Sequence, residues 1–207
     1  MQLYKNFCKE TTDENGKLTS FELVFPENYN FGYDVVDKMA ELVPNDTAVV
    51  WTNPEKEEKI FTYSDISRLS NKAANVFRNH GIKKGDKVAI LLMNCLEWLP
   101  IYFGILKTGA LAVPLNFRYT PEEIKYCLDL AEVDILVFGP EFIGRVEEIS
   151  DRIPGVKQTF YVGAECPTFA ESYDYLVKFM RSIKPDVEIT DDDNAAIYFS
   201  SGTTGFP

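Results

Sequence analysis

The sequence predicts an α/β fold with a mainly parallel, doubly wound sheet and flanking helices. Short apolar runs of strand length alternate with helical patterns from residue 88 onward, which is typical of consecutive βαβ units. One run, residues 88–92, is apolar throughout, as expected for a strand that is covered on both faces. Strands in such sheets are joined by right-handed crossovers, and ligands bind beyond their carboxyl ends.

Residues 1–46 are expected to form an N-terminal extension that ends in a short helix. Val35, Met39 and Leu42 recur at helical spacing within residues 34–42. The mixed, polar composition before them shows no clear strand or helix period. We therefore place the start of the regular fold after this extension.

Residues 47–207 are expected to form an incomplete α/β subdomain that opens with a hairpin. Residues 47–51 and 60–63 are strand-like and flank the charged turn at residues 53–56. The other expected strands cover residues 88–92, 111–115, 134–138, 158–162 and 195–199.

Three predicted helices of this subdomain begin at polar residues that can cap them. Gly81 and Gly109 follow two of these helices, as is common just past a helix end. The expected caps are Ser64, Asn94 with Glu97, and Thr120 with Pro121 and Glu123. Two further helices are expected over residues 141–149 and 169–180.

The charge balance and hydropathy restrict the possible partners and location. The formal net charge is −11 at pH 7, which argues against a nucleic-acid partner, because phosphate backbones attract basic surfaces. The N-terminus lacks the basic and apolar stretches of a signal peptide. The most apolar region, residues 88–115, is too interrupted to span a membrane. We expect no integral membrane segment and a cytoplasmic location.

The cysteines and the single histidine argue against a metal site. The four cysteines contain no C-x-x-C pair, which favours separate thiols in a reducing compartment, and Cys95 and Cys127 are expected to pack in the core. His80 is the only histidine, and its place at a predicted helix end favours a capping role. The acidic run at residues 191–193 is predicted to be a solvated loop before a strand, and no metal ligand is assigned.

The most informative segment lies at the end of the sequence. The strand-like residues 195–199 lead into a run of hydroxyls and glycines: Ser200, Ser201, Gly202, Thr203, Thr204 and Gly205. Glycine permits positive φ and a close approach to an anion, and successive backbone N–H groups can bind phosphate oxygens. The run is not a Walker loop, because no lysine follows Gly205, and the chain contains no G-x-G-x-x-G pattern.

Residues 199–207 resemble the phosphate loop of the adenylate-forming enzymes, whose pattern is roughly [YF]-[TS]-S-G-[ST]-T-G-x-P-K. Three earlier segments resemble other motifs of this family in the same order, so that the resemblance covers most of the chain. They are residues 61–66, 85–97 and 106–116.

Two further segments resemble the acyl-CoA synthetase branch. Residues 116–124 are similar to the N-x-R-x-[ST]-x-x-E-[LI] run of CoA ligases. Residues 31–37 resemble the lead-in of the medium-chain acyl-CoA synthetases and their acetyl-CoA synthetase relatives.

The resemblance implies the N-terminal part of an ATP-dependent acyl-CoA ligase that uses ATP, Mg²⁺, CoA and a small-molecule carboxylic acid. Residues 200–205 would bind the ATP phosphates. Arg118 would lie near CoA, and the alternative is a surface arginine paired with an acid such as Glu122. The catalytic residues are expected downstream of Pro207, so that residues 1–207 alone are expected to be inactive.

Two alternatives stay open at this point. One is an adenylate-forming enzyme that passes its product to a different acceptor. The other is a non-catalytic nucleotide-binding or interaction module. The acyl chain, the oligomeric state and the pathway are left undetermined by the sequence.

Overall fold

The computed structural model describes residues 3–200, and its centre is a five-stranded sheet in the order β6-β5-β7-β8-β9. Every neighbouring pair is parallel, and Val88 lies opposite both Ala112 and Ile135. The strands are β5 (Lys87–Leu91), β6 (Leu111–Pro114), β7 (Ile135–Phe138), β8 (Gln158–Tyr161) and the short β9 (Glu171–Ser172). The predicted fold class, a parallel sheet with flanking helices, is confirmed.

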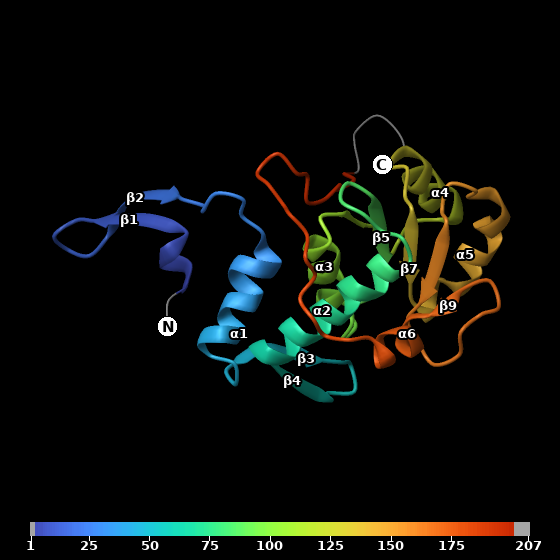
Figure 1. The fold of residues 1–207 in the computed structure, drawn as a ribbon, viewed down its shortest axis with the longest axis horizontal. Coiled ribbons are helices and arrows are strands. Elements are labelled where there is room, and N and C mark those ends of the chain that lie inside the picture. The colour runs from blue at the N-terminus through green and yellow to red at the C-terminus, as the bar shows by residue number, and fades with distance from the viewer. Residues whose placement is uncertain (1–2, 201–207) are drawn as a thin grey trace.

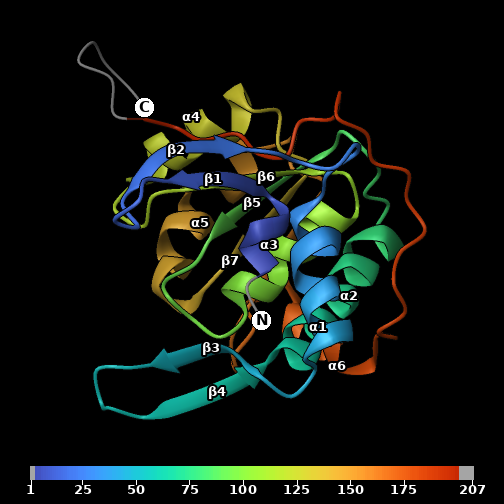
Figure 2. The same ribbon diagram turned by 90° about the vertical axis from the view of Figure 1, so that its left-hand side faces the viewer.

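Helices cover both faces of this sheet, as Figures 1 and 2 show. On one face Val88 and Ile90 pack with helices α2 (Tyr63–Asn79) and α3 (Trp98–Lys107). On the other face the alternate residues of β5 pack with α4 (Pro121–Leu130) and α5 (Ile143–Ile149). Since β5 is buried on both sides from Val88 onward, residues 88–91 are all apolar and do not alternate with polar residues.

Helices α2 and α3 pack closely at Gly104. A Cβ atom added to Gly104 would lie 2.6 Å from Cβ of Ala73 and 2.9 Å from the backbone nitrogen of Ala74. No side chain fits at that distance, so the glycine is required by the close approach of the two helices.

Of the three helix N-caps predicted from the sequence, one is confirmed. Thr120 accepts a hydrogen bond from the N–H of Glu123, whose carboxylate accepts in return, so the predicted capping box of α4 is confirmed. The cap of α2 is Thr62, in a box with Asp65, and the prediction of Ser64 is wrong. Helix α3 begins after Glu97, which already has helical dihedrals, so the predicted box between Asn94 and Glu97 is wrong as well.

Two hairpins precede the sheet. The predicted hairpin is confirmed as β3 (Thr47–Thr52) paired with β4 (Glu58–Thr62). A second hairpin, β1 (Cys8–Thr12) with β2 (Leu18–Leu23), was not predicted. Because its residues are almost all exposed, burial imposes no alternation of apolar and polar residues on it. Figure 1 shows it at the opposite end of the molecule from α4 and α5.

The predicted helix at residues 34–42 is present but begins earlier. It consists of a π-helical segment, η2 (Phe31–Asp37), continued by α1 (Lys38–Leu42). The side chain of Asn30 caps its start by accepting from the N–H groups of Gly32 and Tyr33.

The last predicted helix is shorter than expected. Residues 169–180 were expected to be helical, but α6 covers Tyr173–Phe179, and the residues just before it form β9. Short 3₁₀ segments complete the fold, at Leu3–Asn6, Pro140–Phe142 and Ser150–Arg152. Within residues 3–200, no helix is long and apolar enough to cross a membrane.

Candidate functional site

The chain returns to the sheet at its outer edge, beside β6. Ala112 of β6 donates its N–H to the carbonyl of Ala195 at 3.0 Å and accepts from the N–H of Ile197 at 2.9 Å. The segment therefore runs parallel to β6, as a next strand would. It leads toward the carboxyl edge of the sheet, where ligands bind in open α/β folds.

This pairing is a single bridge, so the strand predicted over residues 195–199 is wrong in length. The next donor on β6 would be the N–H of Pro114, which proline lacks. Beyond Ile197 the segment is held by side chains. Ala196 packs on the face of the sheet that α2 and α3 cover. Ile197 and Phe199 pack on the opposite face, which α4 and α5 cover.

Tyr198 makes one specific polar contact from this segment. Its hydroxyl lies 2.7 Å from the hydroxyl of Tyr102 on α3, although the residue as a whole is 69% exposed. Burial, together with this hydrogen bond, raises the pKa of Tyr102 above its ordinary value of 10.0. The hydroxyl of Tyr102 is therefore protonated at neutral pH, and the bond links α3 to the residues that precede the predicted phosphate loop.

Ser200 follows directly and is the last described residue. The other predicted phosphate-binding residues lie outside the described part of the chain: Ser201, Gly202, Thr203, Thr204 and Gly205. Their role stays a prediction from the sequence.

Arg118 lies in the turn between β6 and α4, at the same edge of the sheet. The expected alternative was a surface arginine paired with an acid such as Glu122: Arg118 is exposed, but Glu122 binds Arg152 at 2.7 Å instead. The guanidinium of Arg118 lies over the ring of Phe117, 5.4 Å from its centroid. Within residues 3–200, no carboxylate forms an ion pair with it, which leaves this exposed cation free to meet an anion.

His80 has the structural role that the sequence predicted. It is the C-terminal cap of α2, and its Nδ1 lies 2.7 Å from the carbonyl oxygen of Val76. Its Nε2 lies 3.5 Å from a carboxylate oxygen of Glu171, and its ring makes a T-shaped contact with the ring of Phe160. The histidine belongs to the packing of α2 against the sheet.

The acidic run at residues 191–193 forms a turn, and two of its members bind groups of the chain. Asp193 lies 2.6 Å from Nζ of Lys84 and accepts hydrogen bonds from Thr190. Asp191 accepts from the N–H of Tyr29 at 3.3 Å. Within the described residues, no group of three histidine, cysteine or acidic side chains could hold a metal ion.

The two cysteines with apolar neighbours pack as predicted. Cys127 is fully buried in the cluster of α4 and α5, and Cys95 lies against the cluster of α2 and α3. Burial raises the pKa of the Cys95 thiol to about 12 and that of Cys127 to about 11. Both are protonated at neutral pH and are poor nucleophiles.

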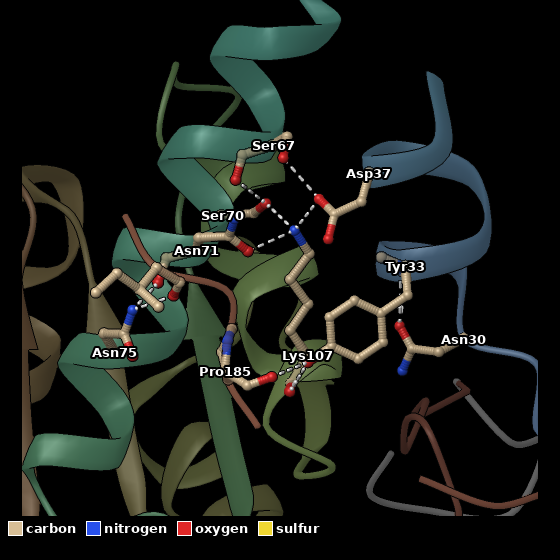
Figure 3. Close-up of polar contacts among 11 residues, drawn as sticks. Asn30, Tyr33, Asp37, Ser67, Ser70, Asn71, Asn75, Lys107 and Pro185 are labelled. Atoms are coloured by element: carbon tan, nitrogen blue, oxygen red, sulfur yellow. Dashed lines mark hydrogen bonds and ion pairs between the residues drawn. The ribbon is translucent and has the colours of Figure 1, made fainter. Parts of the chain in front are cut away.

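A buried lysine is the main polar feature that sequence reasoning missed. Lys107, at the end of α3, is fully buried, and its Nζ lies 2.5 Å from Oδ1 of Asp37. Figure 3 shows the lysine side chain extending between α2 and Asp37. It also donates to Ser70 Oγ at 2.9 Å and Asn71 Oδ1 at 2.8 Å. Burial lowers the pKa of Lys107 below 10.5, although Asp37 acts in the opposite direction.

The sequence profile of the AMP-binding enzyme family matches residues 36–207. The chain belongs to the AMP-binding enzyme family. This match confirms the resemblance that the motifs of residues 61–207 indicated.

The curated members of this AMP-binding enzyme family that resemble the chain include CoA ligases. The chain is 32% identical over 176 residues to the crotonobetaine/carnitine–CoA ligase of Proteus mirabilis, covering 83% of this chain and 34% of the relative. It is 30% identical over 188 residues to the mitochondrial acyl-coenzyme A synthetase ACSM4 of Homo sapiens, covering 88% of this chain and 32% of the relative. The chain thus spans about a third of the length of these relatives.

Solved structures of such enzymes share the fold. The anthranilate CoA ligase AuaEII, solved in complex with anthranoyl-AMP, superimposes with a TM-score of 0.81 at 26% sequence identity. The match covers 88% of this chain and 34% of that chain. The parallel sheet and its helices are therefore those of the N-terminal domain of the AMP-binding enzyme family.

Proposed function

We propose that the chain is the N-terminal part of an ATP-dependent, AMP-forming acyl-CoA ligase. The observation that carries this proposal is the family match over residues 36–207, together with the hydroxyl- and glycine-rich run that follows the segment at the edge of β6. Both relatives described above are named as enzymes that join an acid to CoA.

The reaction would proceed in two steps that share one acyl group. The carboxylate attacks the α-phosphorus of ATP, pyrophosphate leaves, and an acyl-adenylate forms. The CoA thiolate then attacks the acyl carbon, and AMP leaves with the electron pair of the broken C–O bond. Adenylation is needed because a free carboxylate is a poor electrophile, and the protein contributes chiefly by positioning and by stabilising charge.

The run at residues 200–205 would hold the ATP phosphates in the first step. The hydroxyls of Ser200, Ser201, Thr203 and Thr204 would donate to phosphate oxygens, and Gly202 and Gly205 would allow the backbone to approach. Mg²⁺ would supply positive charge to these oxygens when ATP is bound. The geometry at Ala195 and Ile197 supports this placement, because it directs the chain to the carboxyl edge of the sheet.

Arg118 would serve the second step by contacting a phosphate of CoA. Arginine presents a planar set of donors that suits phosphate. Its exposure, and its freedom from the acids of the following helix, support this role.

We also propose that residues 1–46 form an extension and residues 47–207 a part of the α/β subdomain, within a cytoplasmic enzyme. The four cysteines are unpaired, as is usual in a reducing compartment. The network around Lys107 joins the extension to helices α2 and α3, which supports a fixed arrangement of the two parts.

Carboxylate-dependent ATP–pyrophosphate exchange tests the proposal. The protein expressed from the complete reading frame would be assayed with acetate, butyrate, octanoate, palmitate and benzoate. We expect exchange with one class of acid and thioester formation when CoA is added, whereas residues 1–207 alone should form no thioester. Exchange without thioester formation would favour a different acceptor. ATP binding without exchange would favour a non-catalytic module.

A further inference from the structure

The turn that carries Arg118 is held from a distant helix. Arg145 of α5 donates from one nitrogen, Nη1, to the carbonyl oxygen of Phe117 at 2.7 Å and to that of Tyr119 at 3.0 Å. These are the residues immediately before and after Arg118. One guanidinium thus fixes the peptides on both sides of the exposed arginine.

Arg145 is itself held in place by the residue that precedes its helix. Its guanidinium lies over the ring of Phe142, 5.5 Å from the centroid, and Phe142 is buried in the core. Within the turn, the N–H of Arg118 donates to Oδ1 of Asn116 at 3.0 Å, and the N–H of Tyr119 donates to the carbonyl of Asn116. The backbone around Arg118 is therefore held by hydrogen bonds on both sides, while its side chain is exposed.

The acids near this turn are engaged elsewhere. Glu122 binds Arg152 at 2.7 Å. Glu123 accepts from the N–H of Thr120 at 2.7 Å and from its hydroxyl at 2.9 Å, and these hydrogen bonds hold the pKa of Glu123 below its ordinary value. The charge of Arg118 is left without a bound carboxylate in the described part of the chain.

We propose that Arg145 is a positioning residue that holds Arg118 for the phosphate monoester on the nucleotide of CoA. The inference rests on the proposed acyl-CoA ligase function and adds a residue to it. A phosphate monoester carries nearly two negative charges and suits the planar donors of arginine. Fixing the turn before the ligand arrives removes part of the ordering entropy that binding would otherwise cost.

Dephospho-CoA, which lacks this phosphate, provides the test. The ratio of kcat/KM for CoA to that for dephospho-CoA would be measured with the protein from the complete reading frame. We expect Arg118→Gln to remove the preference for CoA. Arg145→Met, which keeps a long side chain against Phe142 but removes the donors, should lower the preference by about tenfold through KM, the order of one charge-assisted hydrogen bond.

The adenylation half-reaction serves as the internal comparison. ATP–pyrophosphate exchange does not involve CoA, so its rate in each variant measures how much folded, adenylating enzyme is present, and the CoA preference is compared at that level. The double variant should be no worse than Arg118→Gln alone, since Arg145 acts through Arg118. Arg68→Met is the matched control: it removes an arginine that pairs with Asp65 on α2, on the other face of the sheet, and it should keep the full preference for CoA.

The outcomes separate the two proposals. Absence of exchange in the unsubstituted protein would overturn the ligase function and this inference with it. Normal exchange with an unchanged CoA preference in Arg145→Met would overturn the role of Arg145 alone. If Arg145→Met does not fold, Arg145→Lys, which retains a charge but not the fork of donors, should give an intermediate preference. A full preference in Arg145→Lys or in Arg118→Gln would overturn the inference.

Discussion

Nζ of Lys107 lies 2.5 Å from Oδ1 of Asp37, and this contact joins the end of α3 to a segment 70 residues earlier in the sequence. Tyr33 lies in the same region. Its hydroxyl donates to the carbonyl oxygen of Lys107 at 2.7 Å and lies 3.3 Å from the carbonyl oxygen of Pro185. Three stretches of the chain therefore meet at one buried lysine, as Figure 3 shows. Oδ2 of Asp37 is buried without a hydrogen-bond partner among the described residues.

Asp37→Asn is expected to lower the free energy of unfolding by about 3–5 kcal/mol, because it leaves the ammonium group of Lys107 buried without its counter-charge. Lys107→Met combined with Asp37→Asn should recover most of this loss, since no buried charge then remains. Urea unfolding of the three proteins measures both effects. As a control, Lys125→Met breaks the exposed pair with Asp129 and should change stability by less than about 1 kcal/mol. Equal stability of Asp37→Asn and the unsubstituted protein would contradict this account.

Gly104→Ala is expected to destabilise the protein by about 1–3 kcal/mol, because the added Cβ would overlap Ala73 and force α2 and α3 apart. The loss would appear as a lower midpoint in thermal unfolding. Gly144→Ala is the control: a Cβ there meets nothing within 4 Å, so the change should be neutral or slightly stabilising. A Gly104→Ala protein as stable as the control would show that the helices can separate freely.

Tyr102→Phe removes the hydrogen bond to Tyr198 and should loosen residues 195–199 locally. The expected loss of stability is about 0.5 kcal/mol, since Tyr198 is largely exposed. Hydrogen exchange measured by mass spectrometry should show faster exchange of this segment and unchanged exchange of β5. Tyr198→Phe should give the same result, and the double variant should add nothing. Tyr175→Phe, at an exposed tyrosine, is the control, and the prediction fails if all three single variants exchange alike.

The capping box of α2 should make stability depend on acid pH. The hydroxyl of Thr62 donates to Asp65 at 2.9 Å, and this bond is the main reason that the pKa of Asp65 lies below its ordinary value of 3.8. A lowered pKa in the folded state means that the stabilisation is present above pH 3.8 and is lost as the pH falls through the folded value. Asp65→Asn should therefore show a weaker decline in urea midpoint between about pH 5 and pH 2 than the unsubstituted protein.

An exposed acid provides the comparison for that measurement. Glu55→Gln, in the turn between β3 and β4, removes a carboxylate outside any helix cap. Its urea midpoint should follow that of the unsubstituted protein at every pH. The same pH profile for Asp65→Asn and Glu55→Gln would show that the box contributes nothing.

Features set by neighbours in the sequence were predictable, and those set by distant contacts were not. The box at Thr120 and Glu123 could be predicted because both partners lie in one turn of helix. The box at Thr62 and Asp65 has the same spacing in the sequence, but Ser64, two residues later, is also a favourable cap residue. The burial of Lys107 had no such signal, because a lysine at a helix end is ordinarily exposed and favourable to the helix dipole.

The same distinction holds for the candidate site. The approach of residues 195–199 to the carboxyl edge of the sheet followed from the alternation of strands and helices, whereas their pairing with β6 was not predicted. The hydrogen bonds from Arg145 to the turn that carries Arg118 could not be predicted, since their acceptors are backbone carbonyls, which every residue has. The early end of the pairing with β6 could have been foreseen from Pro114, which lacks the N–H that the next bond requires.

The position of residues 195–197 on β6 also affects the order of events during synthesis. β6 can pair with β5 as soon as both have left the ribosome, but its other edge stays open until more than eighty further residues, from 114 to 195, have been made. An open strand edge can pair with another chain, and nascent domains fold from the N-terminus onward. Pro114, at the end of β6, shortens that edge. The residue that limits pairing with residues 195–197 therefore also limits aggregation while the chain is incomplete.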